Sequence, residues 1–271
     1  MPNGLCSIDF YENIYPSQHH KNNQGVSVLK QFSVYITLAF LSGCATQQGH
    51  VHQDTATVYN RAVDDAAIAE QTEISDRLFA INSANQALRW KDGKLLVVSW
   101  KSKSSYESNY KNQTHTAPQE KYVTWVTAAP QLQAFCQDFV KNNPHGDLNQ
   151  RLKQYLGLNP DWHYEVFIEL WVDPADVFRP CVDPEIDDGS CRLKFAEDKV
   201  PAVKNIADYP AFYKNLYFND FRYRPGVPWT GLGYTYDWGN PASRVGASEY
   251  ILSPGSPYQI ERVVETAEYC R

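Results

Sequence analysis

The spacing of apolar residues predicts several helices in the first part of the chain. Residues 57–88 repeat apolar positions at helical intervals, which predicts one long helix or two helices broken near residues 82–83. A further helix should begin at Pro130 and carry Cys136 on its apolar face. Asp147 is placed to cap another short helix. A later helix is expected near Phe212 and Leu216.

Strands are expected where apolar residues alternate or run together. Residues 165–172 (EVFIELWV) form the strongest of these runs, and their nearly continuous apolar character predicts a central strand. Other strands are predicted at residues 95–98, 122–127 and 232–238, and a hairpin is predicted from residues 248–252 and 258–264 around a Pro-Gly turn. Residues 101–119 lack periodicity and should form a long loop.

This order of elements predicts the fold class. N-terminal helices are followed by a mixed or antiparallel sheet, which indicates a single α+β domain over residues 57–271. Residues 44–56 are polar and are expected to form a tether in front of it.

A short apolar run in front of that tether has the character of a secretion signal. Residues 32–41 (FSVYITLAFL) follow Lys30 and precede Ser42, Gly43 and Cys44. Ten residues are too few to cross a bilayer as a helix. The sequence Leu41-Ser42-Gly43-Cys44 resembles the lipobox of bacterial lipoproteins. That resemblance implies cleavage before Cys44, lipid on its thiol and attachment of the protein to a membrane.

The lipobox also bears on where the chain starts and where the protein resides. Residues 1–43 would be a leader, with the signal peptide at about residues 28–43, and residues 1–27 are more polar and acidic than a signal requires. We therefore expect translation to start near residues 26–29, at a valine or leucine codon. Ala45 follows the cysteine where an aspartate would favour the inner membrane of Gram-negative bacteria, so the resemblance implies an outer-membrane protein that faces the periplasm.

Composition narrows the set of partners. The formal charge is −6, and there is no block or stripe of Lys and Arg. Nucleic acid is therefore excluded as an expected partner, and the lipid is the expected anchor to the membrane.

The cysteines point to disulfides. Cys6 would be lost with the leader and Cys44 would carry lipid, which leaves four of the six cysteines in the domain. An even number in an oxidising compartment indicates disulfides, and three pairings are open. Closure of the short local loop favours Cys181–Cys191 together with Cys136–Cys270.

Two acidic groups offer candidate chemistry. Asp183, Glu185, Asp187 and Asp188 lie in the loop between Cys181 and Cys191, where their oxygens could hold calcium; the alternative, which we prefer because the spacing departs from that of an EF-hand, is a solvated acidic turn. Asp173 and Asp176 could form a catalytic pair. The pattern Asp-Pro-Ala-Asp is better explained as the N-terminus of a helix.

Residues 248–255 (SEYILSPG) carry a second resemblance. They are similar to the last motif of the ADP-ribosyltransferase superfamily, and residues 237–255 are similar to the end of NAD-glycohydrolase toxin domains. The resemblance implies NAD as the substrate and Glu249 as the catalytic group that stabilises an oxocarbenium-like state. It also implies Arg179 as the NAD-binding arginine and places Tyr236 and Thr235 on the middle strand of the site. The alternative is an ordinary hairpin with Glu249 on its solvent face.

Trp229, Tyr234, Tyr236 and Trp238 form a row of aromatic residues that could either stack on sugars or fill the core. We prefer the core, since aromatic residues dominate buried area. Together these patterns predict an exported lipoprotein with a disulfide-stapled binding or structural domain, and an NAD-consuming enzyme as the alternative.

Overall fold

The computed structural model describes residues 54–223 and 226–271, so the predicted leader, the predicted lipid site at Cys44 and most of the predicted tether lie outside the described residues. The helical elements of the described part, in chain order, are α1 (Thr55–Asp65), η1 (Gln71–Glu73), α2 (Lys103–Asn109), η2 (Glu120–Tyr122), α3 (Ala129–Asn142), α4 (Leu148–Tyr155), η3 (Pro174–Asp176), α5 (Tyr209–Asn215), η4 (Leu216–Phe221) and α6 (Thr266–Tyr269). The η elements are 3-10 turns, except that η4 is a π-helical continuation of α5.

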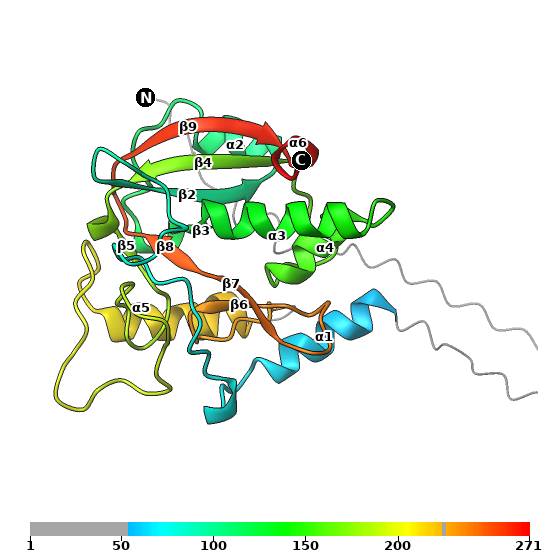
Figure 1. Cartoon of the computed structure of the whole chain (residues 1–271). Coiled ribbons are helices and arrows are strands. Elements are labelled where there is room, and N and C mark those ends of the chain that lie inside the picture. Colours follow the sequence, from blue (N-terminus) through cyan, green and yellow to red (C-terminus); the bar gives the residue numbers. More distant parts are fainter. Residues whose placement is uncertain (1–53, 224–225) are drawn as a thin grey trace, which may run out of the picture. The chain divides into compact units, whose positions relative to one another are not determined.

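Some strands lie between these helices, and the last four strands follow one another without a helix between them (Figure 1). They are β1 (Trp90–Lys91), β2 (Lys94–Lys101), β3 (Thr124–Ala128), β4 (Val166–Val172), β5 (Val177–Phe178), β6 (Tyr234–Tyr236), β7 (Val245–Ser248), β8 (Tyr250–Leu252) and β9 (Tyr258–Glu265). The domain is therefore α+β, as predicted.

The main sheet is antiparallel and curls on itself. Its strand order is β5-β8-β3-β2-β4-β9, with β1 paired to β2, while β6 and β7 form a separate two-stranded sheet. The two ends of the order are joined, because β5 follows β4 after η3 and β9 follows β8 after residues 253–257. Strand β4 thus pairs with β9, and its continuation β5 pairs with β8. This pairing starts at Val166 opposite Glu265 and ends at Phe178 opposite Ile251. Closing a sheet in this way covers edges that would otherwise expose unpaired backbone groups.

Alternation along the strands divides the buried residues between the two faces of this sheet. In β2, Leu95 and Val97 belong to the inner cluster, which also receives side chains from β3, β4, β5, β8 and β9. Leu96, Val98 and Trp100 belong to an outer cluster with side chains of α3, α4 and α6. Residues of α5 and η4 cover the outer side of β5 and β8 in a third cluster.

Both predicted disulfides are present. Cys136–Cys270 joins α3 to the end of the chain, and Cys181–Cys191 closes a ten-residue loop. All four sulfur-bearing residues are buried. The bridges therefore lie inside the packed domain.

Several local predictions are confirmed. Strand β4 is buried along its whole length and pairs on both sides, and Asp147 caps α4 by accepting a hydrogen bond from the Gln150 amide. Asp173 accepts a hydrogen bond from the Ala175 amide, which confirms the capping interpretation of that residue, although the turn that it caps is 3-10. Gly255 has a positive φ of 68°, as the predicted Pro-Gly turn requires.

The predicted helix over residues 57–88 is wrong beyond α1. Only residues 55–65 and 71–73 are helical in this stretch. Leu78 and Ile81 donate backbone hydrogen bonds to the carbonyls of Gly189 and Ile186, so this segment runs extended beside the Cys181–Cys191 loop. Tertiary hydrogen bonds replace the intrahelical ones, and the helical spacing of the apolar residues is coincidental.

Two further predictions need correction. The expected loop over residues 101–119 contains α2, whose N-cap Ser102 accepts a hydrogen bond from the Ser105 amide. The segments predicted as a hairpin are strands β8 and β9, but they pair with different neighbours. The Ser253 amide donates to the Asp176 carbonyl and the Tyr258 amide to the Thr114 carbonyl, so other segments hold the turn between the two strands. Strand β9 then pairs with β4.

Candidate functional site around the Cys181–Cys191 bridge

Glu249 lies between β7 and β8, and its side chain points into the protein. The residue is 5% exposed, which contradicts the alternative of a carboxylate on a solvent face. Its Oε1 accepts a hydrogen bond of 3.1 Å from Nε1 of Trp229. Burial raises the pKa of Glu249 to about 8, and the Trp229 hydrogen bond opposes that rise only in part. The carboxyl group therefore keeps its proton at neutral pH.

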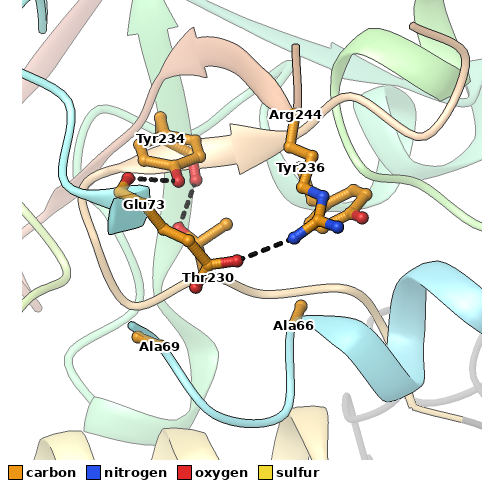
Figure 2. A pocket seen from close by; sticks show the side chains of 7 residues that line it. All are labelled: Ala66, Ala69, Glu73, Thr230, Tyr234, Tyr236 and Arg244. Atoms are coloured by element: carbon orange, nitrogen blue, oxygen red, sulfur yellow. Dashed lines mark hydrogen bonds and ion pairs between the residues drawn. The ribbon is translucent and has the colours of Figure 1, made fainter. Parts of the chain in front are cut away.

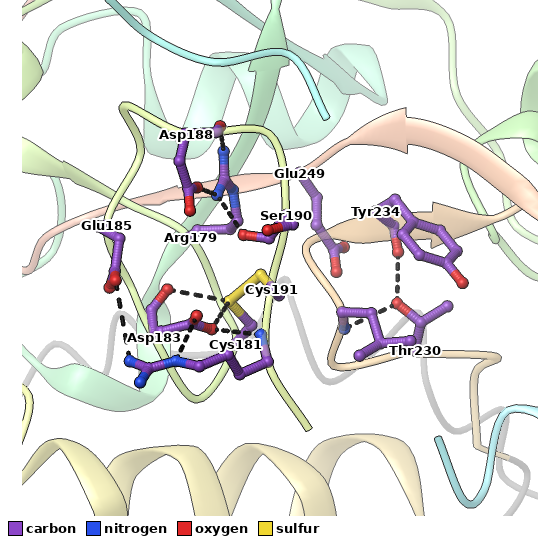
Figure 3. The surroundings of a disulfide bond; sticks show 12 residues. Arg179, Cys181, Asp183, Glu185, Asp188, Ser190, Cys191, Thr230, Tyr234 and Glu249 are labelled. Atoms are coloured by element: carbon purple, nitrogen blue, oxygen red, sulfur yellow. Dashed lines mark hydrogen bonds and ion pairs between the residues drawn. A yellow bond between two sulfur atoms is a disulfide. The ribbon is translucent and has the colours of Figure 1, made fainter. Parts of the chain in front are cut away.

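Arg179 follows β5 and is completely buried. Its Nη1 lies 2.6 Å from Oδ1 of Asp188 and 3.1 Å from the Ser190 carbonyl, and its Nη2 donates to the Asp188 carbonyl. Figure 3 shows the guanidinium directed into the loop that the bridge closes. Because its two terminal nitrogens are occupied by the loop, Arg179 acts as an internal clamp and does not present a cation to a ligand.

Gly233 connects Glu249 with Arg179 and the bridge. Its carbonyl accepts the backbone hydrogen bond of Glu249, 3.0 Å long. A Cβ at this position would lie 2.5 Å from Cδ of Arg179 and 2.7 Å from Sγ of Cys191. The structure thus brings Glu249 and Arg179, two of the predicted catalytic residues, close to Gly233. Side-chain atoms pack against Gly233 so tightly that even a Cβ there would clash.

The other two predicted catalytic residues lie elsewhere. Thr235 bonds the Tyr155 carbonyl through its hydroxyl at 2.6 Å, which directs it toward α4. Tyr236 lies on the other face of β6 and donates to Asp65 in α1 at 2.7 Å. Burial, together with that hydrogen bond, raises the pKa of Tyr236 above its usual range. Glu249 and Tyr236 therefore do not share a cleft.

Tyr236 instead lines a small cleft, shown in Figure 2. Arg244 bridges two carboxylates there, at 2.8 Å from Asp65 and 2.9 Å from Glu73. The cleft has room for about 10 Å³, the volume that roughly one water molecule needs. A nucleotide does not fit this space, and Arg244 is already paired with the two carboxylates.

Arginine side chains pair with most of the carboxylates in the acidic loop. Asp183 accepts hydrogen bonds of 2.9 Å from the amide and from Nε of Arg192, while Asp188 pairs with Arg179. Glu185 lies 3.9 Å from Arg192, and Asp187 is exposed. Calcium needs several free oxygens that converge, and this arrangement does not support that hypothesis.

One cluster of side chains in the described residues has ligand types that could bind a transition metal, and it contains both cysteines of the bridge. Among residues 54–223 and 226–271, one group of three potential ligands converges, namely Cys181, Asp183 and Cys191. The two sulfur atoms are bonded to each other, so this group is a structural staple.

The aromatic row belongs to the core, as preferred from the sequence. Trp229, Tyr234, Tyr236 and Trp238 are all buried. Trp229 stacks on Phe221 with ring centroids 4.5 Å apart, and Trp238 meets Tyr59 edge-on at 5.6 Å. These rings fasten α1 and η4 to the domain.

The sequence interpretation missed a buried ion pair close to this row. Arg151 in α4 binds Asp237 with two hydrogen bonds of 2.7 and 2.6 Å, and Asp237 is almost fully buried. The partners are 86 residues apart in the chain, so no local pattern signals the pair.

Replacing Asp237 with alanine is expected to cost about 3 kcal/mol of folding free energy, because Arg151 would keep a charge in a largely buried site without its partner. Urea unfolding of the variant would measure the loss. Asp161→Ala serves as the control, since Asp161 is exposed. A change below about 1 kcal/mol, the range of exposed pairs, would show that the pair has no structural weight.

No helix among the described residues has the length and apolar character needed to cross a membrane. Comparisons of this chain with protein-family models, curated proteins and solved structures found no match. The chemistry of its own residues is therefore the basis for a functional conclusion.

Proposed function

We propose that this protein is an exported lipoprotein, anchored through Cys44 to the periplasm-facing leaflet of an outer membrane, and that its α+β domain has a binding or structural role. One observation carries the proposal. The four cysteines of the domain are joined in two buried bridges, which is the state expected in an oxidising compartment. Cys6 and Cys44 remain outside these bridges, and Cys44 stands at the end of a lipobox-like sequence, where a lipid would be attached.

The domain geometry supports a non-catalytic role. Glu249 and Arg179 contact interior partners, and the cleft beside Tyr236 has room for no more than roughly one water molecule. Groups of this kind stabilise a fold and do not meet a substrate. NAD hydrolysis or ADP-ribosyl transfer has no specific observation in its favour.

Replacing Cys44 with serine should release the protein from the membrane, because the thiol that would carry the lipid is removed. Fractionation of cells is expected to move the protein from the membrane pellet to the soluble fraction. Mass spectrometry of the Cys44 peptide from the unaltered protein should show an acylated N-terminus.

Cys6→Ser is the matched control, and it should leave both the fractionation and the mass unchanged. An unaltered protein with a free Cys44 thiol would contradict the proposal. So would a Cys44→Ser variant that stays in the pellet after a salt wash.

A further inference from the structure

An exposed apolar surface lies where α1 ends beside η4. Ile68, Phe218 and Tyr223 are 76, 56 and 61% exposed, and they are half of the large apolar side chains found at the surface of the described part. Single exposed apolar residues need no explanation, but several gathered together mark a contact surface. We call these three residues the apolar patch.

Hydrogen bonds hold together the two segments that carry the patch. The Tyr217 hydroxyl donates to the Ala67 carbonyl at 2.6 Å, and Nη1 of Arg222 donates to the Val63 carbonyl at 2.9 Å. In the sequence, Ile68 follows Ala67 and Phe218 follows Tyr217. Phe218 also contacts the Tyr217 ring edge-on, with centroids 4.9 Å apart. The two segments that carry the patch are thus fixed to each other in the folded domain.

Ile68 follows the predicted lipid site at Cys44 by 24 residues, whereas Phe218 and Tyr223 belong to a later segment that hydrogen bonds join to residues 63–67. Ten residues separate Cys44 from Thr55, where α1 begins, and they reach at most about 36 Å when fully extended. Helix α1 has 11 residues, a length of about 16 Å, and the patch starts three residues after it ends. A membrane that holds Cys44 is therefore within reach of the patch.

Its residue types suit the boundary between headgroups and acyl chains. Phenylalanine, tyrosine and isoleucine bury apolar surface there, and the exposed Lys214, one turn before Phe218, can direct its ammonium group to the headgroups. The formal charge of −6 opposes a purely electrostatic attraction to anionic lipid. Apolar insertion is the interaction that these residues provide.

We propose that the apolar patch of Ile68, Phe218 and Tyr223 inserts shallowly into the membrane that carries the lipidated Cys44 and so sets the orientation of the domain on it. The inference rests on the proposed function, since the lipid brings the patch to the membrane. The surface of the domain that lies opposite the patch would then face away from the bilayer.

Quenching by brominated lipid tests this orientation. Phe218→Trp in the full, acylated protein would be reconstituted into vesicles of phosphatidylethanolamine with a minority of phosphatidylglycerol. Its added fluorescence should fall by roughly half with lipid brominated high in the acyl chains, because interfacial side chains lie about 5–10 Å below the headgroups. Ser108→Trp is the matched control; it lies in α2, which Figure 1 shows on the other side of the sheet from α1.

The results separate the two proposals. Quenching of the tryptophan at position 218 but not of that at position 108 would support the inserted patch. Absence of quenching at position 218, or equal quenching at both positions, would overturn the patch while leaving an acylated lipoprotein. The acylation itself is read independently from the mass of the Cys44 peptide. A second variant, Ile68→Ser with Phe218→Ser, should raise the exposure of the 217–223 amides to hydrogen exchange on vesicles and leave exchange in solution unchanged.

Discussion

Replacing Cys136 and Cys270 together with alanine is expected to lower the free energy of unfolding by about 5 kcal/mol. The bridge spans 134 residues, and closing so long a loop removes much of the entropy of the unfolded chain. It also fixes the end of the chain against α3, where both sulfurs are buried in the outer core cluster. Urea unfolding of the purified domain, monitored by circular dichroism, would measure the loss.

The second bridge supplies the internal comparison. Cys181→Ala with Cys191→Ala opens a loop of ten residues, so the same entropic argument predicts a smaller loss of about 3 kcal/mol. The order of the two effects is the test. If opening the short loop cost more than opening the long one, packing around Arg179 and Gly233 would outweigh loop entropy.

Glu249→Gln is expected to remove a large pH dependence of stability. In the folded protein burial raises the pKa of Glu249 to about 8, against 4.5 for a glutamate exposed to water. The folded state therefore binds the proton more tightly, and the stability present below pH 4.5 is lost as the pH rises to about 8. Each pH unit in this window changes the free energy of unfolding by roughly 1.4 kcal/mol, or about 4–5 kcal/mol in all.

Glutamine keeps the shape of the side chain and cannot ionise. The variant should therefore gain stability relative to the unaltered protein as the pH rises from 5 to 8, measured by urea unfolding at several pH values. Glu197→Gln makes the same change on an exposed side chain and should show no such gain. A constant difference between Glu249→Gln and the unaltered protein across this range would mean that Glu249 is ionised in the fold.

The same variant separates the proposed function from an NAD-consuming enzyme. A binding or structural lipoprotein keeps its membrane attachment and its fold when Glu249 is replaced, and the purified oxidised domain leaves NAD intact. Hydrolysis of NAD by the unaltered domain, lost in Glu249→Gln, would contradict the proposal and establish Glu249 as a catalytic residue.

Local signals in the sequence predicted much of the fold because they act over a few residues. Asp147 and Asp173 prefer cap positions, Pro130 starts a helix, and the apolar run of β4 must be buried whatever its neighbours are. The pairing of the cysteines followed from the same kind of reasoning, since closing a short loop costs little entropy.

The errors came from interactions between distant segments. Residues 74–88 have helical spacing, but the Leu78 and Ile81 amides bond to carbonyls of the Cys181–Cys191 loop, about a hundred residues later in the chain. Strands β8 and β9 are adjacent in sequence, yet each pairs with a strand from an earlier part of the chain. Hydrogen bonds of this kind depend on the finished sheet, so a local pattern does not contain them.

The candidate site shows the same division. By itself, the sequence determined the residue types available for function: the lipobox-like Cys44, four cysteines suited to bridges, and an acid at position 249. Only the tertiary structure decided what surrounds that acid, because the indole of Trp229 reaches it from another segment and burial keeps it protonated. The tertiary structure also decided that Arg179 binds Asp188 and that Tyr236 donates to Asp65 in α1. Buried charges and hydroxyls need hydrogen-bond partners, and folding determines which groups lie near enough to serve.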